Sequence, residues 1–156
     1  MTEETQPKSL LIIGAGVKQI PAIQLAKSRG YFLIVSDMNP AAEGFHLADR
    51  QLVVSTRDAA ATRDLAVSLA SEIRIDGVMT MASESAITVA EVANALNLPG
   101  LPPVAARNAT HKVERQECFA KHNVPAPRFA RAESLEEGLH QARQLGWPVV
   151  VKPADS

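Results

Sequence analysis

The stretch that decides the fold is Leu10-Leu11-Ile12-Ile13-Gly14-Ala15-Gly16. A short run of branched apolar residues that ends at a glycine turn is typical of a parallel strand buried on both faces. Apolar residues then recur at helical intervals from Val17 to Arg29, with Pro21 in the first turn and Gly30 at the end. This part of the sequence therefore predicts a strand, a tight turn and a helix.

The same alternation continues as far as residue 97. Apolar runs predict three further strands, and Ala-rich amphipathic segments predict two further helices, the second with Ser83 as its N-cap: strands over 31–35, 51–54 and 76–81, and helices over 58–71 and 83–97. Alternating strands and helices predict an α/β fold in which a doubly wound parallel sheet carries helices on both faces. Functional residues of such sheets lie at the carboxyl ends of the strands.

The pattern changes after residue 107. Helices are predicted over 110–123 and 134–145, the latter with a capping box formed by Ser134 and Glu137. A strand is predicted over 147–153. We therefore expect a polar, disordered leader over 1–8, a Rossmann-like domain over 9–108, and over 109–156 the beginning of an α+β unit. That unit has too few elements to bury its apolar faces, which predicts a piece of a longer protein.

Composition and charge exclude several classes of protein. The 156 residues include 16 Lys and Arg against 17 Asp and Glu, a net charge of −1, which argues against a nucleic-acid binder. No apolar run approaches the roughly 18 residues that span a bilayer, and the N-terminus has no signal-peptide pattern, so we expect a cytoplasmic protein without a membrane partner. One cysteine, Cys118, and four scattered histidines predict no disulfide and no metal site.

Two glycines and an acid at the ends of predicted strands form the first candidate site. A glycine turn between a strand and a helix lets a phosphate approach the backbone, and the helix N-terminus attracts anions. Gly14 and Gly16 fit that role, and Asp37 stands where an acid binds ribose in nicotinamide-binding domains. However, Gln19 replaces the third glycine of that fingerprint. Two interpretations stay open, a dinucleotide site and a purely structural turn.

Three further charged residues follow predicted strands or begin a helix. Glu84, after the fourth strand, is placed either to bind an amine or to complement a helix dipole. Lys112 begins the first helix of the C-terminal unit. Lys152 follows three apolar residues, so its stem is expected to leave a buried strand, where a lysine costs desolvation unless an anion meets it.

Several motifs, in this order, resemble the N-terminal part of the ATP-grasp ligases. They are the Gly14/Gly16 turn, Asp37-x-Asn39-Pro40, Thr110-His111-Lys112, Val124-Pro125-x-Pro127 and the segment 146–153, Gly-Trp-Pro-Val-Val-Val-Lys-Pro. The last segment is the most specific. Within that family the chain is similar to the branch of the carbamoyl-phosphate synthase large chain and biotin carboxylase.

The resemblance implies a preATP-grasp domain over 9–108 and the start of the first ATP-grasp subdomain over 109–156. It implies that Lys112 and Lys152 contact the phosphates of ATP, and that the loops carrying Asp37 and Glu84 face the acceptor substrate. Family members form an acyl phosphate from ATP and a small-molecule carboxylate, with Mg²⁺. The implied metal and adenine ligands lie downstream of this chain, so the chain alone is expected to be inactive, and a homodimer is a candidate assembly. His111 departs from the aspartate of many relatives.

Two other interpretations compete with the ligase. One is a nicotinamide-dinucleotide-binding domain of an oxidoreductase, with Gly14, Gly16 and Asp37 as its site, and Gln19 argues against it. The other is a non-catalytic interaction module, and the presence of both lysines argues against that.

Overall fold

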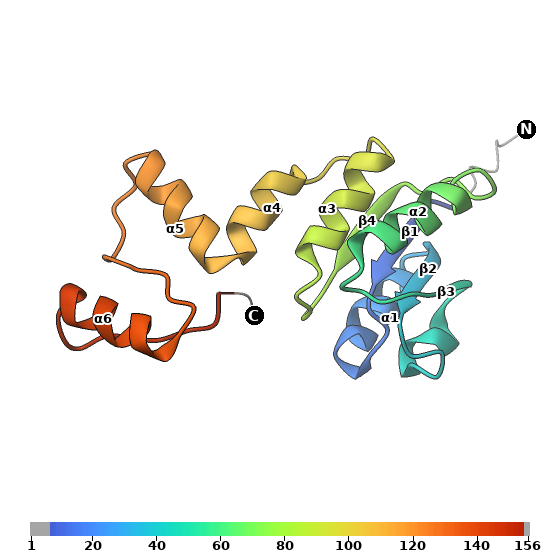
Figure 1. The fold of residues 1–156 in the computed structure, drawn as a ribbon. Coiled ribbons are helices and arrows are strands. Elements are labelled where there is room, and N and C mark those ends of the chain that lie inside the picture. Colours follow the sequence, from blue (N-terminus) through green and yellow to red (C-terminus); the bar gives the residue numbers. More distant parts are fainter. Residues whose placement is uncertain (1–6, 155–156) are drawn as a thin grey trace, which may run out of the picture. The chain divides into compact units, whose positions relative to one another are not determined.

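Strand β1 (Ser9–Ile13) occupies an inner position of a four-stranded parallel sheet in the computed structural model, which describes residues 7–154. The chain divides into two units between Ala106 and Arg107, and the sheet belongs to the first (Figure 1). The strand order is β3-β2-β1-β4, with β2 over Phe32–Asp37, β3 over Arg50–Val53 and β4 over Gly77–Thr80. All four predicted strands of this unit are confirmed.

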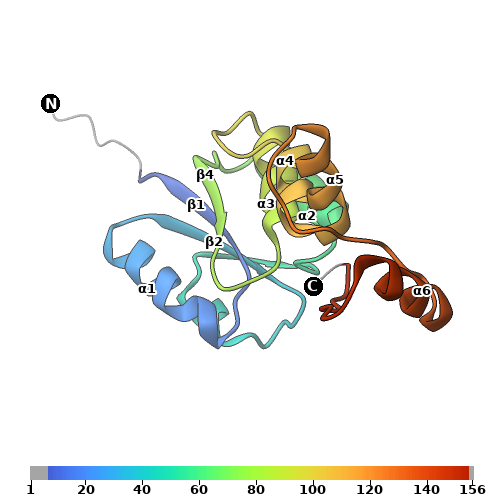
Figure 2. The same cartoon turned by 90° about the vertical axis from the view of Figure 1, so that its left-hand side faces the viewer.

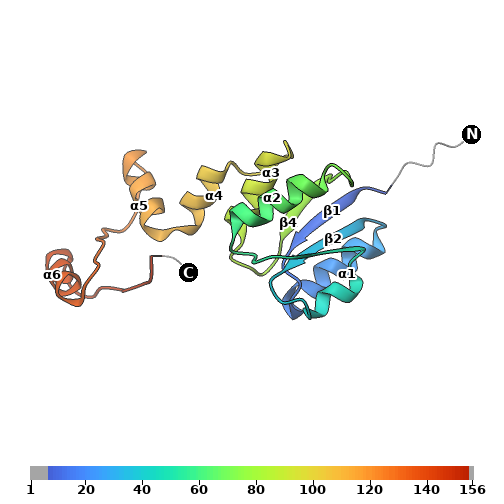
Figure 3. The same ribbon diagram turned by 45° about the vertical axis from the view of Figure 1, so that its right-hand side comes forward.

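Alternate residues of the two inner strands supply two separate cores. Ile12, Leu33 and Val35 pack on the side of α1 (Ile20–Ser28). Leu11, Ile13 and Ile34 pack on the other side, with residues of α2 (Ala59–Leu69) and α3 (Ala86–Ala95). Figures 2 and 3 show the sheet between α1 on one face and these two helices on the other. The doubly wound α/β sheet is therefore confirmed.

Helix starts in this unit differ in detail from the sequence analysis. The segment after Gly16 begins as a 3-10 turn, η1 (Val17–Gln19), before α1. A second 3-10 segment, η2 (Glu43–Leu47), lies in the predicted polar loop and buries Phe45. The helix predicted from Ser83 begins three residues later, with Ser85 as the N-cap, and the Ser83 hydroxyl lies 2.8 Å from that of Ser85. Ser83 is therefore not the cap.

The second unit, residues 107–156, is helical over its described part. Its helices are α5 (Lys112–Lys121) and α6 (Leu135–Leu145), and α4 (Pro103–Thr110) crosses the division between the units. The sequence analysis missed α4, because Pro103 suggests a break but is tolerated in a first helical turn. The predicted Ser134 cap is confirmed, since its hydroxyl accepts from the Glu137 N–H at 3.2 Å.

The prediction of a strand over 147–153 is wrong. No strand is assigned within 107–154, and Val150 and Val151 are 81% and 91% exposed. Lys152 is exposed too, so it does not leave a buried strand as predicted. A strand needs a neighbour to accept and donate its backbone hydrogen bonds, and this unit offers none between Arg107 and Ala154.

The predicted leader over 1–8 falls mostly on residues 1–6, which lie outside the described residues. The Lys8 carbonyl accepts a 3.0 Å hydrogen bond from the Phe32 N–H, so the backbone at Lys8 already borders the sheet. Between residues 7 and 154, no helix is both long enough and apolar enough to cross a membrane.

Candidate functional site

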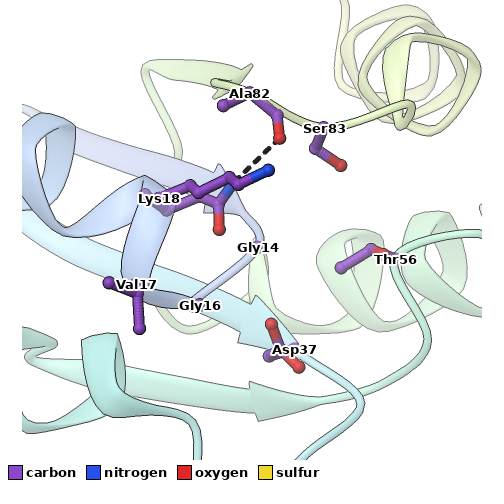
Figure 4. A pocket seen from close by; sticks show the side chains of 9 residues that line it. Gly14, Gly16, Val17, Lys18, Asp37, Thr56, Ala82 and Ser83 are labelled. Carbon is purple, nitrogen blue, oxygen red and sulfur yellow. Dashed lines mark hydrogen bonds between the residues drawn. The ribbon is translucent and has the colours of Figure 1, made fainter.

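An open hollow of about 340 Å³ lies at the carboxyl edge of the sheet (Figure 4). Most of its lining residues follow the end of a strand: Gly14, Gly16, Val17, Lys18, Gln19, Asp37, Thr56, Ala82 and Ser83. Strand β1 has β2 on one side and β4 on the other, so the chain changes winding direction at β1. A doubly wound sheet binds its ligand in the crevice outside such a point.

Asp37 holds the glycine turn in shape. Its Oδ2 accepts from the Ala15 N–H at 2.9 Å, and its Oδ1 accepts from the Asn39 N–H at 3.0 Å. The Gly14 N–H donates to the Ser36 carbonyl at 2.7 Å, and Gly14 has a φ of +104°, which favours glycine. The predicted site residues Gly14, Gly16 and Asp37 therefore meet in one hollow, and Asp37 is a support of its wall as well as part of its lining.

Gln19 fills the place that the third glycine would leave open. Its side chain is almost buried, at 7% exposure, and its Nε2 donates to the Met81 carbonyl at 2.6 Å and to that of Ala82 at 3.3 Å. The bond to Ala82 is the dashed line in Figure 4. A Cβ on Gly16 would lie only 3.2 Å from the Gln19 Oε1. Gln19 thus links the turn after β1 to the loop after β4.

The charges around the hollow are unevenly partnered. Glu84, the residue after Ser83, does not line the hollow. Its carboxylate forms an ion pair with Arg57 at 3.0 Å. Lys18 does line the hollow as an exposed side chain, and no hydrogen bond or ion pair of its ammonium is found among residues 7–154. Sequence analysis missed Lys18 and Thr56. The signal for Lys18 was its place two residues after Gly16, in the 3-10 turn that follows the glycines.

Lys112 and the segment around Lys152 meet at the start of α5. The Lys112 N–H donates to the Ala154 carbonyl at 2.8 Å, which brings the backbone two residues beyond Lys152 to this helix end. The Nζ of Lys112 is buried, and within the described part of the chain it has no hydrogen-bond partner. A buried ammonium without an acceptor costs free energy, so this atom is suited to an anion.

His111 caps the same helix. Its Nδ1 accepts from the Glu114 N–H at 3.2 Å, and the Glu114 carboxylate lies 3.8 Å from that nitrogen. The imidazole thus does what an aspartate does at an N-cap, and it leaves Lys112 in place at the first helical position. Among residues 7–154 no group of three His, Cys, Asp or Glu side chains could hold a metal ion.

The support given by Asp37 predicts the effect of removing it. Asp37→Ala leaves the Ala15 and Asn39 N–H groups without their acceptors, and we expect the free energy of unfolding to fall by about 1–3 kcal/mol. Chemical denaturation of the chain measures this. The exposed Asp64→Ala on α2 is the control, with an expected change within about 0.5 kcal/mol. Equal effects of the two substitutions would contradict a supporting role for Asp37.

Comparison with known proteins agrees with this architecture. Residues 24–100 match the sequence model of the ATP-grasp N-terminal domain. The formate-dependent phosphoribosylglycinamide formyltransferase of Prochlorococcus marinus (strain MIT 9303) is 29% identical over 152 residues, which cover 96% of this chain and 38% of that protein. The carbamoyl phosphate synthase large chain of Methanobrevibacter smithii is 27% identical over 169 residues, which cover 94% of this chain and 15% of that one.

A solved structure of a ligase has a similar fold over almost the whole chain. The L-amino acid ligase from Bacillus licheniformis matches with a TM-score of 0.71 and 27% identity over 97% of this chain and 38% of that chain. The chain thus spans less than two fifths of the length of these relatives. The resemblance drawn from the motifs is confirmed: residues 24–100 match the ATP-grasp N-terminal domain, and the chain has homologues among the carbamoyl phosphate synthase large chains and the formate-dependent formyltransferases.

Proposed function

We propose that the chain is the N-terminal part of an ATP-dependent carboxylate–amine ligase or carboxylase. In this proposal Lys112 and Lys152 bind the phosphates of ATP, and the hollow in the first unit binds the acceptor substrate. The domain match and the ligases among the homologues support the reaction class. The other parts of the active site would come from sequence equivalent to the part of those relatives that this chain does not cover.

The observation that carries the proposal is the buried, unpartnered Nζ of Lys112. The bond from the Lys112 N–H to the Ala154 carbonyl brings the backbone near Lys152 to the same helix end, from which the exposed Lys152 side chain would supply a second cation. Two ammonium groups near a helix N-terminus favour a polyanion, since both the charges and the backbone N–H groups attract phosphate oxygens. A triphosphate is the polyanion that an ATP-grasp ligase uses.

The proposed reaction has two displacements. A carboxylate oxygen of the first substrate attacks the γ-phosphorus of ATP, the bond to the β–γ bridging oxygen breaks, and ADP leaves. The nitrogen of the acceptor then attacks the acyl carbon, and inorganic phosphate leaves. The lysines stabilise the negative charge that shifts to the leaving oxygen, and they hold the phosphates in line for attack.

Mg²⁺ is part of the proposal, but the described residues assign no ligand to it. Neither unit, between residues 7 and 154, offers three acidic, histidine or cysteine side chains in one cluster. We expect the 156-residue chain alone to bind ATP weakly and to catalyse nothing.

A nicotinamide dinucleotide is a poorer fit to the hollow. The fingerprint of such domains uses its third glycine for close packing of the helix against the strand. In this chain the Gln19 side chain occupies that position and lies against Gly14 and Gly16. An interaction module without a ligand would not explain why a lysine nitrogen is buried without a partner.

Binding of Mg–ATP tests the proposal on the 156-residue chain. Phosphorus NMR of Mg–ATP, with increasing protein, is expected to show saturable broadening of the phosphate signals. Lys112→Ala and Lys152→Ala should each weaken binding roughly tenfold or more, as expected for the loss of a charge-assisted contact. Lys121→Ala, at the far end of the same helix α5, is the matched control and should leave binding unchanged.

Two results would overturn the proposal. One is the absence of saturable ATP binding, or binding that both lysine variants retain in full. The other is binding of NADH that survives both lysine variants and disappears in Asp37→Ala, which would favour the dinucleotide interpretation.

A further inference from the structure

Two unpartnered polar atoms lie on one face of helix α5. The Lys112 Nζ and the Gln116 Oε1 are both buried, and neither has a hydrogen-bond partner within residues 7–154. Lys112 is the first residue of α5, and Gln116 follows four positions later on the same helix. Residues four apart are neighbours on a helix, with Cβ atoms about 5–6 Å apart. A donor without an acceptor therefore lies one helical turn from an acceptor without a donor.

The direction of side chains on a helix favours a contact between these two residues. Each Cα–Cβ bond is tilted toward the helix N-terminus, so a long side chain covers the turn before its own Cα. For Gln116, that turn carries Lys112. The lysine stem is long and flexible, so the ammonium can meet the Gln116 carbonyl through a change of rotamer, without movement of the helix.

The groove that Gln116 lines does not give its oxygen a donor. This groove of about 470 Å³ belongs to the second unit, and most of its lining side chains are apolar. Arg128, the cation among its lining residues, donates instead to the carbonyls of Gln144 and Leu145, at 3.1 and 3.4 Å. Lys112, on the same helix face, is thus the donor that matches Gln116.

We propose that Gln116 is a positioning residue for Lys112, and that its side-chain carbonyl accepts one N–H of the ammonium when the other N–H groups meet phosphate oxygens of ATP. This inference rests on the proposed function, because it requires that Lys112 binds the phosphates. An ammonium has three N–H donors, and a donor left without an acceptor in a buried site costs free energy. A neutral amide completes the set, whereas a carboxylate at this position would repel the phosphates.

Gln116→Met tests this inference, because methionine keeps the length of the side chain and removes the acceptor oxygen. In the phosphorus NMR titration of the 156-residue chain, we expect it to weaken Mg–ATP binding roughly tenfold, as for a lost hydrogen bond to a charged group. Gln141→Met is the matched control, since Gln141 is also a half-buried glutamine and lines the same groove from α6. It should leave ATP binding unchanged.

A double-mutant cycle separates positioning of Lys112 from a contact between Gln116 and the nucleotide. In the Lys112→Ala background, Gln116→Met should change ATP binding less than about twofold, because the group that it positions is gone. In the Lys152→Ala background, it should still weaken binding roughly tenfold. Equal losses in the two backgrounds would overturn the inference, and so would a Gln116→Met chain that binds ATP as tightly as the chain without substitutions.

Stability gives a measurement that a merely structural role would move in the opposite direction. Without ATP the Gln116 oxygen has no donor, so its removal should leave the midpoint of chemical unfolding unchanged or raise it. A lower midpoint would show that Gln116 holds the fold, and it would contradict the positioning role.

The same titrations separate this inference from the proposed function. Lys112-dependent ATP binding that Gln116→Met leaves intact would remove only the positioning role. If the chain without substitutions showed no saturable binding of Mg–ATP, the proposed function and the inference would both be wrong.

Discussion

Replacing Ile34 by alanine is expected to lower the free energy of unfolding by about 2–5 kcal/mol. Ile34 is fully buried at the middle of β2, opposite Leu11 of β1, and it belongs to the core beneath α2 and α3. The substitution removes three carbon atoms and leaves a cavity that strands held on both sides can fill only in part. Denaturant unfolding, followed by circular dichroism, measures the change.

Leu25→Ala is the control for this prediction. Leu25 lies on α1 and is more than half exposed, so the truncation removes carbon atoms that are already largely in water. We expect a change within about 0.5 kcal/mol. If Ile34→Ala cost no more than Leu25→Ala, the doubly covered sheet described above would not be the stable core of this unit.

Gly44→Ala is expected to destabilise the chain by about 1–3 kcal/mol, the usual cost of overpacking. The Gly44 N–H donates to the Ala15 carbonyl at 2.7 Å, so η2 lies directly against the glycine turn. An added Cβ would come within 2.8 Å of that carbonyl oxygen and 2.7 Å of the Ile23 Cδ1. Backbone cannot move aside as a flexible side chain can, so the contact between η2 and the turn must loosen.

A second glycine shows that the clash, and not the loss of glycine, causes this effect. At Gly138, inside α6, an added Cβ would lie 3.8 Å from the Ala132 Cβ, an ordinary contact. Gly138→Ala should leave stability unchanged or raise it by up to about 1 kcal/mol, because alanine favours the helix. Thermal unfolding of the two variants side by side decides the matter, and a loss in Gly138→Ala equal to that in Gly44→Ala would refute the explanation.

The sheet could be predicted from the sequence because its signals are local. The apolar run before Gly14 identifies a buried strand by itself, and Asp37 is placed at the carboxyl edge by the strand that precedes it. Gln19 could be recognised only as a missing glycine, because its partners at Met81 and Ala82 lie more than 60 positions away. No pattern of spacing reveals a contact of that range.

The prediction of a strand over 147–153 was wrong for a different reason. Its three valines have a strong preference for strands, but a preference becomes a strand only when a neighbouring strand completes the backbone hydrogen bonds. The described part of the second unit contains none. Lys112 was placed correctly at a helix start, whereas the burial of its nitrogen depends on tertiary packing and could not be predicted from the sequence.

The hydrogen bonds from Gln19 to the loop after β4 limit how chimeras of this domain and its relatives can be built. The Gln19 side-chain amide donates to the carbonyls of the first two residues of the loop after β4. The conformation of that loop therefore depends on the residue at position 19. A loop taken from a relative that has glycine at position 19 evolved without the hydrogen bonds that Gln19 donates, so it would not fit this domain in the same conformation. Chimeras should therefore be cut so that both pieces come from the same parent.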